Sequence, residues 1–120
     1  MSDSDPDLTY LHTIKKLQEL NLGILHLIET AKSASDSQSL AAKARKVFSG
    51  MLVLNAGDDQ QSAEAAIREG RDDAISFGSL FIANPDLPVR FANGWPLAAP
   101  DRATFYGGTE RGYTDYPKFK

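Results

Sequence analysis

Three short segments carry groups that could bind a ligand, and each directly follows an apolar run. They are Glu29-Thr30, Asn55 to Asp58, and Gly78-Ser79. A carboxylate can line a pocket, and a glycine lets backbone N–H groups approach an anion without a Cβ in the way. If the apolar runs are parallel strands, their carboxyl ends meet at one rim, where such folds bind ligands. The sequence therefore predicts a ligand site at this rim.

Composition excludes several other kinds of chemistry. The chain has no cysteine, and its two histidines, His12 and His26, are too isolated to suggest a metal site. The net charge of -3 and the scattered lysines and arginines argue against nucleic acid. No apolar run is long enough to span a membrane, and the acidic start MSDSDPDL is unlike a signal peptide. We expect a soluble, cytoplasmic protein.

The segments that must position these groups alternate between helix and strand over residues 1–78. Asp5-Pro6 is typical of a helix start, because aspartate caps the helix and proline needs no N–H partner there. Short apolar runs bounded by turn residues indicate buried strands. The order predicted is a helix ending near Asn21, a strand at 23–28, a helix at 40–48, a strand at 50–54, a helix at 58–69 and a strand at 73–77.

This order indicates an α/β fold with one parallel sheet. Strands without polar alternation, separated by helices, are typical of a parallel sheet covered on both faces. We expect residues 1–120 to form a single partial domain, in which residues 79–120 are mostly an irregular tail. The stretches FIANPDLPVRF and TFYGGTERGYTDYP are too rich in aromatic, proline and glycine residues for ordinary helix or strand.

Several segments together closely resemble the C-terminal part of the old yellow enzyme family. They are YLHTIKKL, LGILHLIE, GMLVLNAGD, DAISFGSLFIANPDLPVRF and TFYGGTERGYTDYP, and in order they cover essentially the whole chain. The family consists of FMN-dependent ene-reductases built on a (β/α)8 TIM barrel. The resemblance implies that the three strands are about the sixth, seventh and eighth of that barrel, followed by a wrapping tail.

The resemblance also implies a set of cofactor contacts. In such barrels the phosphate site commonly lies at the loops after strands seven and eight and at a short extra helix. Leu80–Ala83 would be that helix, with its N–H groups facing the phosphate. Tyr106 would line the substrate pocket. No catalytic or metal-binding residue is assigned, and the residues expected at FMN are Ala56, Gly57, Asp58, Phe77, Gly78, Ser79 and Phe105.

Three departures from the family weaken this site. The arginine that usually follows the glycine of FG and pairs with the phosphate is replaced by Ser79, whose hydroxyl cannot neutralise a dianion. Asp58 and Asp59 place acidic groups close to the expected phosphate. The first five strands, which carry the family's proton donor and substrate-carbonyl ligands, have no counterpart in these residues.

Other conspicuous residues have structural explanations. We expect His26 to be a hydrogen-bonded core histidine and His12 to lie on the surface. For Glu29, a pocket position and a helix-capping or salt-bridge role both remain open. In the tail, aromatic residues should provide packing and a hydrophobic latch: Tyr113, Tyr116 and Trp95-Pro96.

Two functions of different class follow. The chain could be the FMN-binding segment of an oxidoreductase that passes hydride from NAD(P)H through FMN to an activated alkene, such as an enone, or to a quinone. The rest of the barrel would then come from a complementary chain or from residues removed by truncation. The alternative is a non-catalytic remnant that self-associates or binds another protein, because a three-stranded sheet has two open edges.

Overall fold

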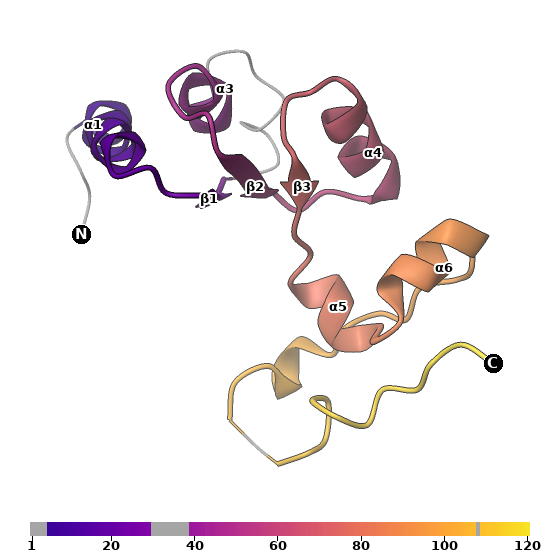
Figure 1. Ribbon diagram of the computed structural model, residues 1–120. Helices are drawn as coiled ribbons and strands as arrows, with labels where there is room; N and C mark the ends of the chain where they lie inside the picture. The colour runs from indigo at the N-terminus through magenta and orange to yellow at the C-terminus, as the bar shows by residue number, and fades with distance from the viewer. Residues whose placement is uncertain (1–4, 30–38, 108) are drawn as a thin grey trace. The chain divides into compact units, whose positions relative to one another are not determined.

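Helices and strands alternate over the first part of the chain, as the sequence predicts. A computed structural model describes residues 5–29, 39–107 and 109–120. Contacts divide the chain into two compact units, Met1–Ser76 (unit 1) and Phe77–Lys120 (unit 2). In chain order the elements are α1 (Pro6–Glu19), β1 (Ile24–Ile28), α3 (Leu40–Arg45), β2 (Met51–Asn55), α4 (Gln60–Arg68), β3 (Ala74–Ile75), α5 (Ser79–Ala83), α6 (Leu87–Asn93) and the 3-10 helix η1 (Arg102–Thr104) (Figure 1).

The strands of unit 1 form one parallel sheet in the order β1-β2-β3, which confirms the predicted topology. β1 and β2 pair over their full length, from Ile24 opposite Met51 to Ile28 opposite Asn55. β3 is shorter than the predicted 73–77, because its ladder pairs only Ala74 and Ile75 with β2. The side chains that follow β3 therefore carry part of its attachment to the sheet.

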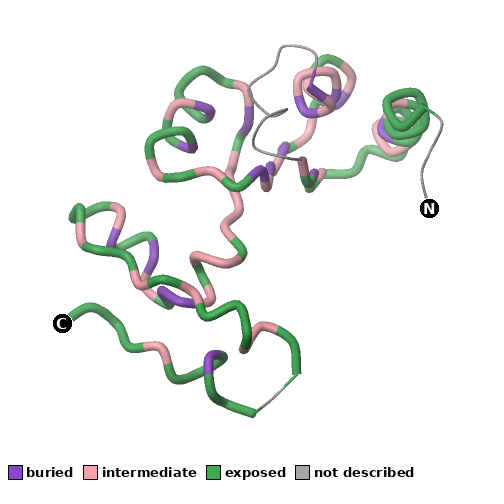
Figure 2. Tube along the Cα trace, turned by 180° about the vertical axis from the view of Figure 1, so that it is seen from behind, coloured by how far each residue is buried: buried purple, intermediate pink, exposed green. Residues whose placement is uncertain are grey.

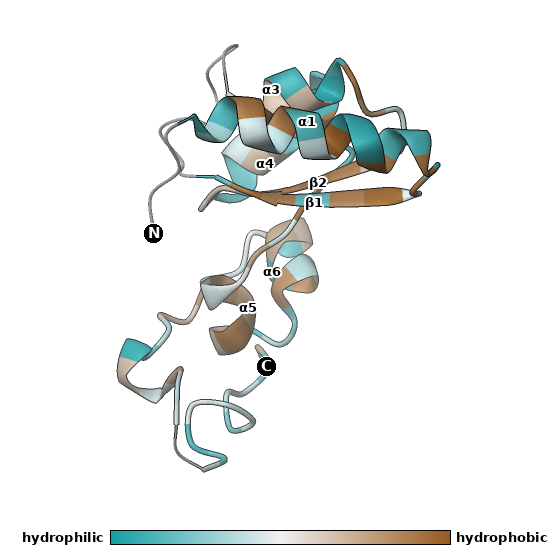
Figure 3. Cartoon of the chain, turned by 90° about the vertical axis from the view of Figure 1, so that its left-hand side faces the viewer, coloured by the Kyte–Doolittle hydropathy of each residue, from teal (hydrophilic) through white to brown (hydrophobic). Residues whose placement is uncertain are grey.

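The core of unit 1 lies between the sheet and helices α1, α3 and α4, which cover the same face (Figure 3). Buried side chains from strands and helices meet there, and Figure 2 marks these positions. The core cluster consists of Ile14, Leu27, Ala41, Ala44, Phe48, Leu52, Leu54 and Ala56. Burying a side chain the size of leucine contributes about 1.5–3 kcal/mol, so this cluster holds α1 and α3 to the sheet.

The opposite face of the sheet differs from the expectation that both faces are covered. Ile24 is 61% exposed, Ile28 78% and Met51 47%. Because side chains alternate along a strand, helices on one side bury Leu27, Leu52 and Leu54 and leave these neighbours uncovered. An apolar strand sequence predicts burial of both faces, but among the described residues of unit 1 helices cover only one.

The helices α1 and α4 begin at capping aspartates, as predicted, but the cap of α4 lies one residue later than expected. Asp5 caps α1 by accepting a hydrogen bond from the Leu8 N–H at 3.0 Å, and Pro6 opens the helix. The cap of α4 is Asp59 rather than the predicted Asp58. Asp59 accepts from the Ser62 N–H at 2.8 Å, and the Ser62 hydroxyl accepts from the Asp59 N–H at 3.1 Å. This reciprocal pair is a capping box.

Unit 2 contains more helix than the sequence analysis predicts. The short helix expected at residues 80–83 is present as α5, but α6 was missed, and η1 adds a single turn. The prediction that FIANPDLPVRF is irregular was therefore wrong. Pro88 lies in the first turn of α6, where a missing N–H does no harm, and Gly94 ends the helix with a φ of 63°.

A buried ion pair ties α6 to the C-terminal tail. Arg90 is only 5% exposed, and its Nε donates to Asp86 Oδ1 at 2.7 Å. Its two terminal nitrogens donate to the carbonyl oxygens of Pro96 at 2.9 Å and Pro117 at 3.0 Å. The second oxygen of Asp86 accepts the Phe119 N–H at 2.9 Å. Both residues of the ion pair, Arg90 and Asp86, are thus hydrogen-bonded to the C-terminal tail.

Aromatic residues add to the attachment of the tail, partly as expected. Trp95 stacks on Phe119 with ring centroids 4.7 Å apart, which supports the predicted latch. The Tyr116 hydroxyl accepts the Asp101 N–H at 2.9 Å and so pins the tail. Tyr113 is 75% exposed, so the prediction that it is a packing residue was wrong.

Candidate functional site

Polar side chains from the end of β2, the residue after β3 and the middle of β1 meet on the sheet face that the helices of unit 1 leave uncovered. The Ser76 hydroxyl lies 2.9 Å from His26 Nε2 and 3.1 Å from Asn55 Nδ2. Asn55 Nδ2 also donates to the Ser76 carbonyl at 3.0 Å. His26 is hydrogen-bonded, as predicted, but it is exposed rather than part of the core, because it lies on the face without helices. His12 is exposed, as predicted.

Glu29 caps a helix, which decides between the two alternatives that the sequence left open. Its two carboxylate oxygens accept the N–H groups of Leu40 at 2.8 Å and Ala41 at 3.1 Å. The Ser39 hydroxyl accepts the next N–H, that of Ala42, at 3.0 Å. A negative charge at the start of α3 also interacts favourably with the helix dipole. Glu29 is thus engaged in holding the fold.

The loop after β2 contains the first group of predicted cofactor residues. Ala56 is buried and packs in the core, so its contribution to a ligand would come from its backbone. Gly57 has a φ of 75°, in the left-handed region that favours glycine. Asp58 Oδ1 accepts the Ser62 hydroxyl at 2.8 Å, and its Oδ2 is buried without a hydrogen-bond partner among the described residues.

Negative charge accumulates near this loop. Hydrogen bonds from Ser62 hold the pKa of Asp59 below its usual range, so this cap is ionised at neutral pH. Asp72 is 4% exposed, and burial raises its pKa; the charge of Arg71 offsets part of this rise, and Asp58, Glu29 and Asp73 add smaller upward contributions. A phosphate dianion near Asp58 and Asp59 would meet like charges, so the backbone of this loop suits an anion better than its side chains do.

Unit 2 begins with the second group of predicted cofactor residues. The Phe77 ring packs edge-on against Phe91, with ring centroids 5.3 Å apart. Gly78 is the N-cap of α5, and its carbonyl accepts the N–H groups of Phe81 at 3.0 Å and Ile82 at 3.2 Å. A Cβ added at Gly78 would meet no atom within 4 Å, so the protein itself does not require glycine there. Ser79 is the first residue of α5.

The two predicted aromatic contacts lie beside each other just after η1. The Phe105 and Tyr106 rings are 6.4 Å apart in an edge-on arrangement. Phe105 is half-buried, whereas Tyr106 is 93% exposed. A tyrosine this exposed has little packing role in the chain, and its assignment to a substrate pocket stays a prediction.

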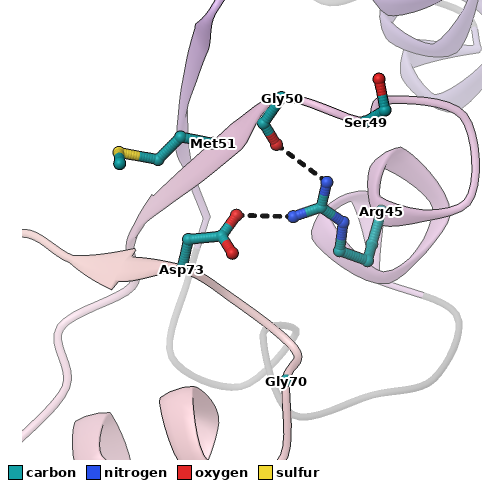
Figure 4. Close-up of a pocket in the computed structure, with 6 residues that line it drawn as sticks. All are labelled: Arg45, Ser49, Gly50, Met51, Gly70 and Asp73. Carbon is teal, nitrogen blue, oxygen red and sulfur yellow. Dashed lines mark hydrogen bonds and ion pairs between the residues drawn. The ribbon is translucent and has the colours of Figure 1, made fainter.

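A pocket of about 480 Å³ lies at the opposite, amino ends of β2 and β3 (Figure 4). Arg45 is its central residue and donates to Asp73 at 2.6 Å and to the carbonyls of Phe48 at 2.5 Å and Gly50 at 2.9 Å. Asp73 Oδ2 also accepts the Leu52 N–H at 2.7 Å. These hydrogen bonds anchor α3 to the strand starts, so the charged groups of this pocket already have partners within the protein.

The described residues contain neither a potential metal-binding cluster nor a membrane-spanning helix. No group of three or more His, Cys, Asp or Glu residues there could hold a metal ion. No helix among the described residues is long and apolar enough to cross a membrane.

Known proteins similar to this chain share one family. The chain is 38% identical over 116 residues to a 12-oxophytodienoate reductase-like protein of Solanum lycopersicum, covering 96% of this chain and 32% of that protein. It is 35% identical over 118 residues to a "probable flavin mononucleotide-dependent alkene reductase" of Leishmania infantum, at 97% and 32% coverage. No family model matches the chain.

Solved structures agree with these sequence relatives. The old yellow enzyme of Trypanosoma cruzi superposes with a TM-score of 0.88 at 38% identity, over 100% of this chain and 32% of that one. The chain is homologous to a part of the old yellow enzymes. Morphinone reductase, solved in complex with tetrahydroNAD, matches with a TM-score of 0.87 and 37% identity over 99% of this chain. The three parallel strands of the present chain and their helices correspond to part of the old yellow enzyme TIM barrel.

The chain spans about a third of the length of the old yellow enzyme relatives that it matches. Of the predicted cofactor residues, Ala56–Asp58 follow β2 in the sequence, Phe77–Ser79 follow β3, and Phe105 follows η1; their contact with a cofactor stays a prediction. The acidic Asp58 and Asp59 and the neutral Ser79 suit a phosphate poorly.

Proposed function

We propose that this chain is the FMN-binding segment of an old-yellow-enzyme-like oxidoreductase. The observation that carries the proposal is the match of the whole chain, at 38% identity and a TM-score of 0.88, to part of an old yellow enzyme. A relative of similar identity is described as flavin mononucleotide-dependent, and a structural neighbour was solved with tetrahydroNAD. Both names support a flavin and a nicotinamide as the cofactors of a complete barrel. The proposal also places the protein in the cytoplasm.

When bound, FMN supplies hydride transfer from NAD(P)H to an activated alkene or a quinone. The part played by this chain is to bind and orient. Backbone N–H groups of Ala56–Asp58 and Phe77–Ser79 would approach the phosphate, because an N–H can donate to an anion without adding charge. Phe105 would lie against the flavin and Tyr106 would line the substrate pocket. None of these residues delivers a proton to substrate.

The isolated chain should bind FMN weakly. One charge-assisted hydrogen bond contributes about 1.5–3 kcal/mol, so the absence of an arginine at position 79 weakens binding by roughly tenfold to a hundredfold. The flavin-ring contacts of five further strands are also lacking. The purified chain should therefore be colourless and should not reduce an enone with NADPH.

A titration of the labelled chain with FMN, followed by the ¹H–¹⁵N signals of its backbone amides, tests this proposal. We expect the amides of Gly57, Gly78 and Ser79 to shift at millimolar FMN, while riboflavin, which lacks the phosphate, leaves them unchanged. Shifts confined to other residues, or no shift at all, would contradict the assigned phosphate contacts. Tight stoichiometric flavin with enone reduction would contradict the view that this segment is insufficient.

The second candidate function is a non-catalytic module that self-associates or binds another protein. Exposed apolar side chains on the open sheet face favour it, notably Ile24, Ile28 and Met51. β1 and β3 also pair with a strand on only one side in the described sheet, and unpaired strand edges promote association. Light scattering would show an oligomer in this case. In the first case it would show a monomer, whose amide signals respond to FMN.

A further inference from the structure

The terminal segment, Pro117–Phe119, has no regular secondary structure and is held through its backbone. A terminal nitrogen of Arg90 donates to the Pro117 carbonyl at 3.0 Å, and Asp86 Oδ2 accepts the Phe119 N–H at 2.9 Å. These two backbone groups belong to residues two positions apart. Proteins that bind peptides use the same division of roles, in which backbone hydrogen bonds give affinity and side-chain contacts give specificity.

The Phe119 ring makes the side-chain contacts of the segment. It stacks on Trp95 with ring centroids 4.7 Å apart and an interplanar angle of 28°, and the guanidinium carbon of Arg90 lies 5.8 Å from its centroid. Stacking and cation–π attraction both require an aromatic ring at this position. The contacts therefore suit a peptide whose aromatic residue stands two positions after the residue that offers its carbonyl.

The residues that hold the segment are themselves connected by contacts within residues 86–96. Arg90 Nε donates to Asp86 Oδ1 at 2.7 Å, and these two side chains are 6% and 9% exposed. The Trp95 N–H donates to the Arg90 carbonyl at 2.9 Å, and Arg90 also donates to the Pro96 carbonyl at 2.9 Å. Asp86, Arg90 and Trp95 thus form a site, the peptide site, whose members are joined without the terminal segment. A site with such internal support loses less freedom when it binds.

The terminal segment is attached in a way that allows it to leave the peptide site. Residues 117–120 are all exposed, and so are most of residues 109–116. Exposed backbone with few buried contacts opens locally at low cost in free energy. Just before the segment, the Tyr116 hydroxyl accepts the Asp101 N–H at 2.9 Å. A second copy of the chain carries the same residues and can make the same contacts, so exchanging the segment between copies sacrifices none of them.

We propose that the peptide site takes the terminal segment of a second copy of this chain in place of its own. The chain's own segment competes, because a short flexible connection gives it an effective concentration of about millimolar at the site. Exchange between copies therefore becomes appreciable only as the chain approaches that concentration. The inference concerns unit 2 alone and does not depend on FMN binding.

The direct test mixes wild-type chain labelled with ¹³C and ¹⁵N with unlabelled wild-type chain and records isotope-filtered NOEs. At about millimolar chain concentration we expect an NOE between the Trp95 ring of one copy and the Phe119 ring of another. Diluting the sample about tenfold should lower this signal several-fold relative to the NOE within one copy. Absence of the NOE between copies would overturn the proposal. An oligomer that forms without it would assign association to another surface, such as the open sheet face.

A peptide titration separates the site from its own segment. Phe119→Ala in the full chain keeps the peptide site but removes the ring that fills it. We expect the peptide TDYPKFK, which has the sequence of residues 114–120, to change the fluorescence of Trp95, the single tryptophan, in this variant. The peptide TDYPKAK should bind at least about tenfold more weakly, because it lacks the stacking ring.

Lys118→Ala is the matched control, because Lys118 is exposed and lies between the two backbone contacts. It should respond to TDYPKFK like the wild type and more weakly than Phe119→Ala, since its own segment still fills the site. Equal responses of Phe119→Ala to the two peptides, or no response while urea unfolding shows it to be folded, would overturn the proposal. If Phe119→Ala is unfolded, the NOE experiment decides alone, since it needs no substitution.

Discussion

The side-chain amide of Asn84 and the backbone of Ala98 exchange two hydrogen bonds. Asn84 Nδ2 donates to the Ala98 carbonyl at 3.1 Å, and the Ala98 N–H donates to Asn84 Oδ1 at 2.8 Å. Asn84 is 0% exposed, and its Nδ2 also donates to the Leu80 carbonyl at 2.9 Å. A single side chain thus joins the end of α5 to the start of the tail.

Replacing Asn84 should loosen the tail. Asn84→Ala leaves the half-buried N–H and carbonyl of Ala98 without their partners, which costs about 1–3 kcal/mol. Amide hydrogen exchange should show the largest loss of protection at Ala98. Asn93→Ala is the control, because this exposed asparagine makes one hydrogen bond, to the Val89 carbonyl, and should change stability by less than about 0.5 kcal/mol. Equal effects of the two substitutions would contradict this role.

Acid should release the tail through Asp86. Burial pushes the pKa of Asp86 up, but hydrogen bonds from Arg90 and from the Phe119 N–H outweigh it and leave the pKa below 3.8. A lowered carboxyl pKa contributes stability that is present above 3.8 and is lost as the pH falls through the folded-state value. The fluorescence of Trp95, the single tryptophan, should follow this loss, since its ring stacks on Phe119.

Asp86→Asn should lower the stability of unit 2 at neutral pH and flatten this acid transition. Arg90→Met should also flatten it, because it removes the partner of the same carboxylate. An acid transition of Trp95 that persists unchanged in Asp86→Asn would assign the effect to another group.

Asp72→Asn should stabilise the protein at neutral pH. Burial raises the pKa of Asp72, and its Oδ1 has no hydrogen-bond partner among the described residues. A raised carboxyl pKa means that the folded state loses stability as the pH rises from 3.8 through the folded-state value. The neutral amide avoids this loss, so the gain, about 1 kcal/mol, should be present at pH 7 and vanish at pH 3.

Thermal unfolding at several pH values measures this gain. Glu69→Gln is the control, because Glu69 is an exposed carboxylate and pairs with Arg71 at the surface. A gain for Asp72→Asn that is the same at pH 3 and pH 7 would show that ionisation is not its cause.

Restoring a positive charge at position 79 should strengthen FMN binding. Ser79→Arg supplies a charge-assisted contact of about 1.5–3 kcal/mol, which corresponds to roughly tenfold to a hundredfold in affinity. Asp58→Asn should strengthen it further by removing a like charge. Isothermal titration with FMN and riboflavin separates the effects, since riboflavin has no phosphate and should bind Ser79→Arg no better than the wild type. An equal gain for both flavins would place position 79 away from the phosphate.

Local sequence patterns were sufficient to predict most of the framework. Apolar runs and capping residues gave the order of helices and strands, because hydrophobic periodicity and the needs of helix ends are properties of neighbouring residues. The parallel arrangement followed from the alternation of strand and helix. α6 was missed because the stretch FIANPDLPVRF was judged too rich in aromatic and proline residues for a helix, whereas Pro88 lies in the first turn of α6, where proline is well tolerated.

The sequence by itself therefore determined the element order of unit 1, its parallel sheet, the family and which residues follow β2 and β3 along the chain. The tertiary structure decided which side chains are buried and which distant residues they hydrogen-bond. His26 was expected in the core, but the helices cover only the face that carries Leu27, so it lies exposed and bonds to Ser76. Arg90 gave no sign of burial, because its partners at Pro96 and Pro117 are brought to it only by the folded tail. Burial and hydrogen bonding between distant residues depend on how the elements are placed in space, which no local pattern contains.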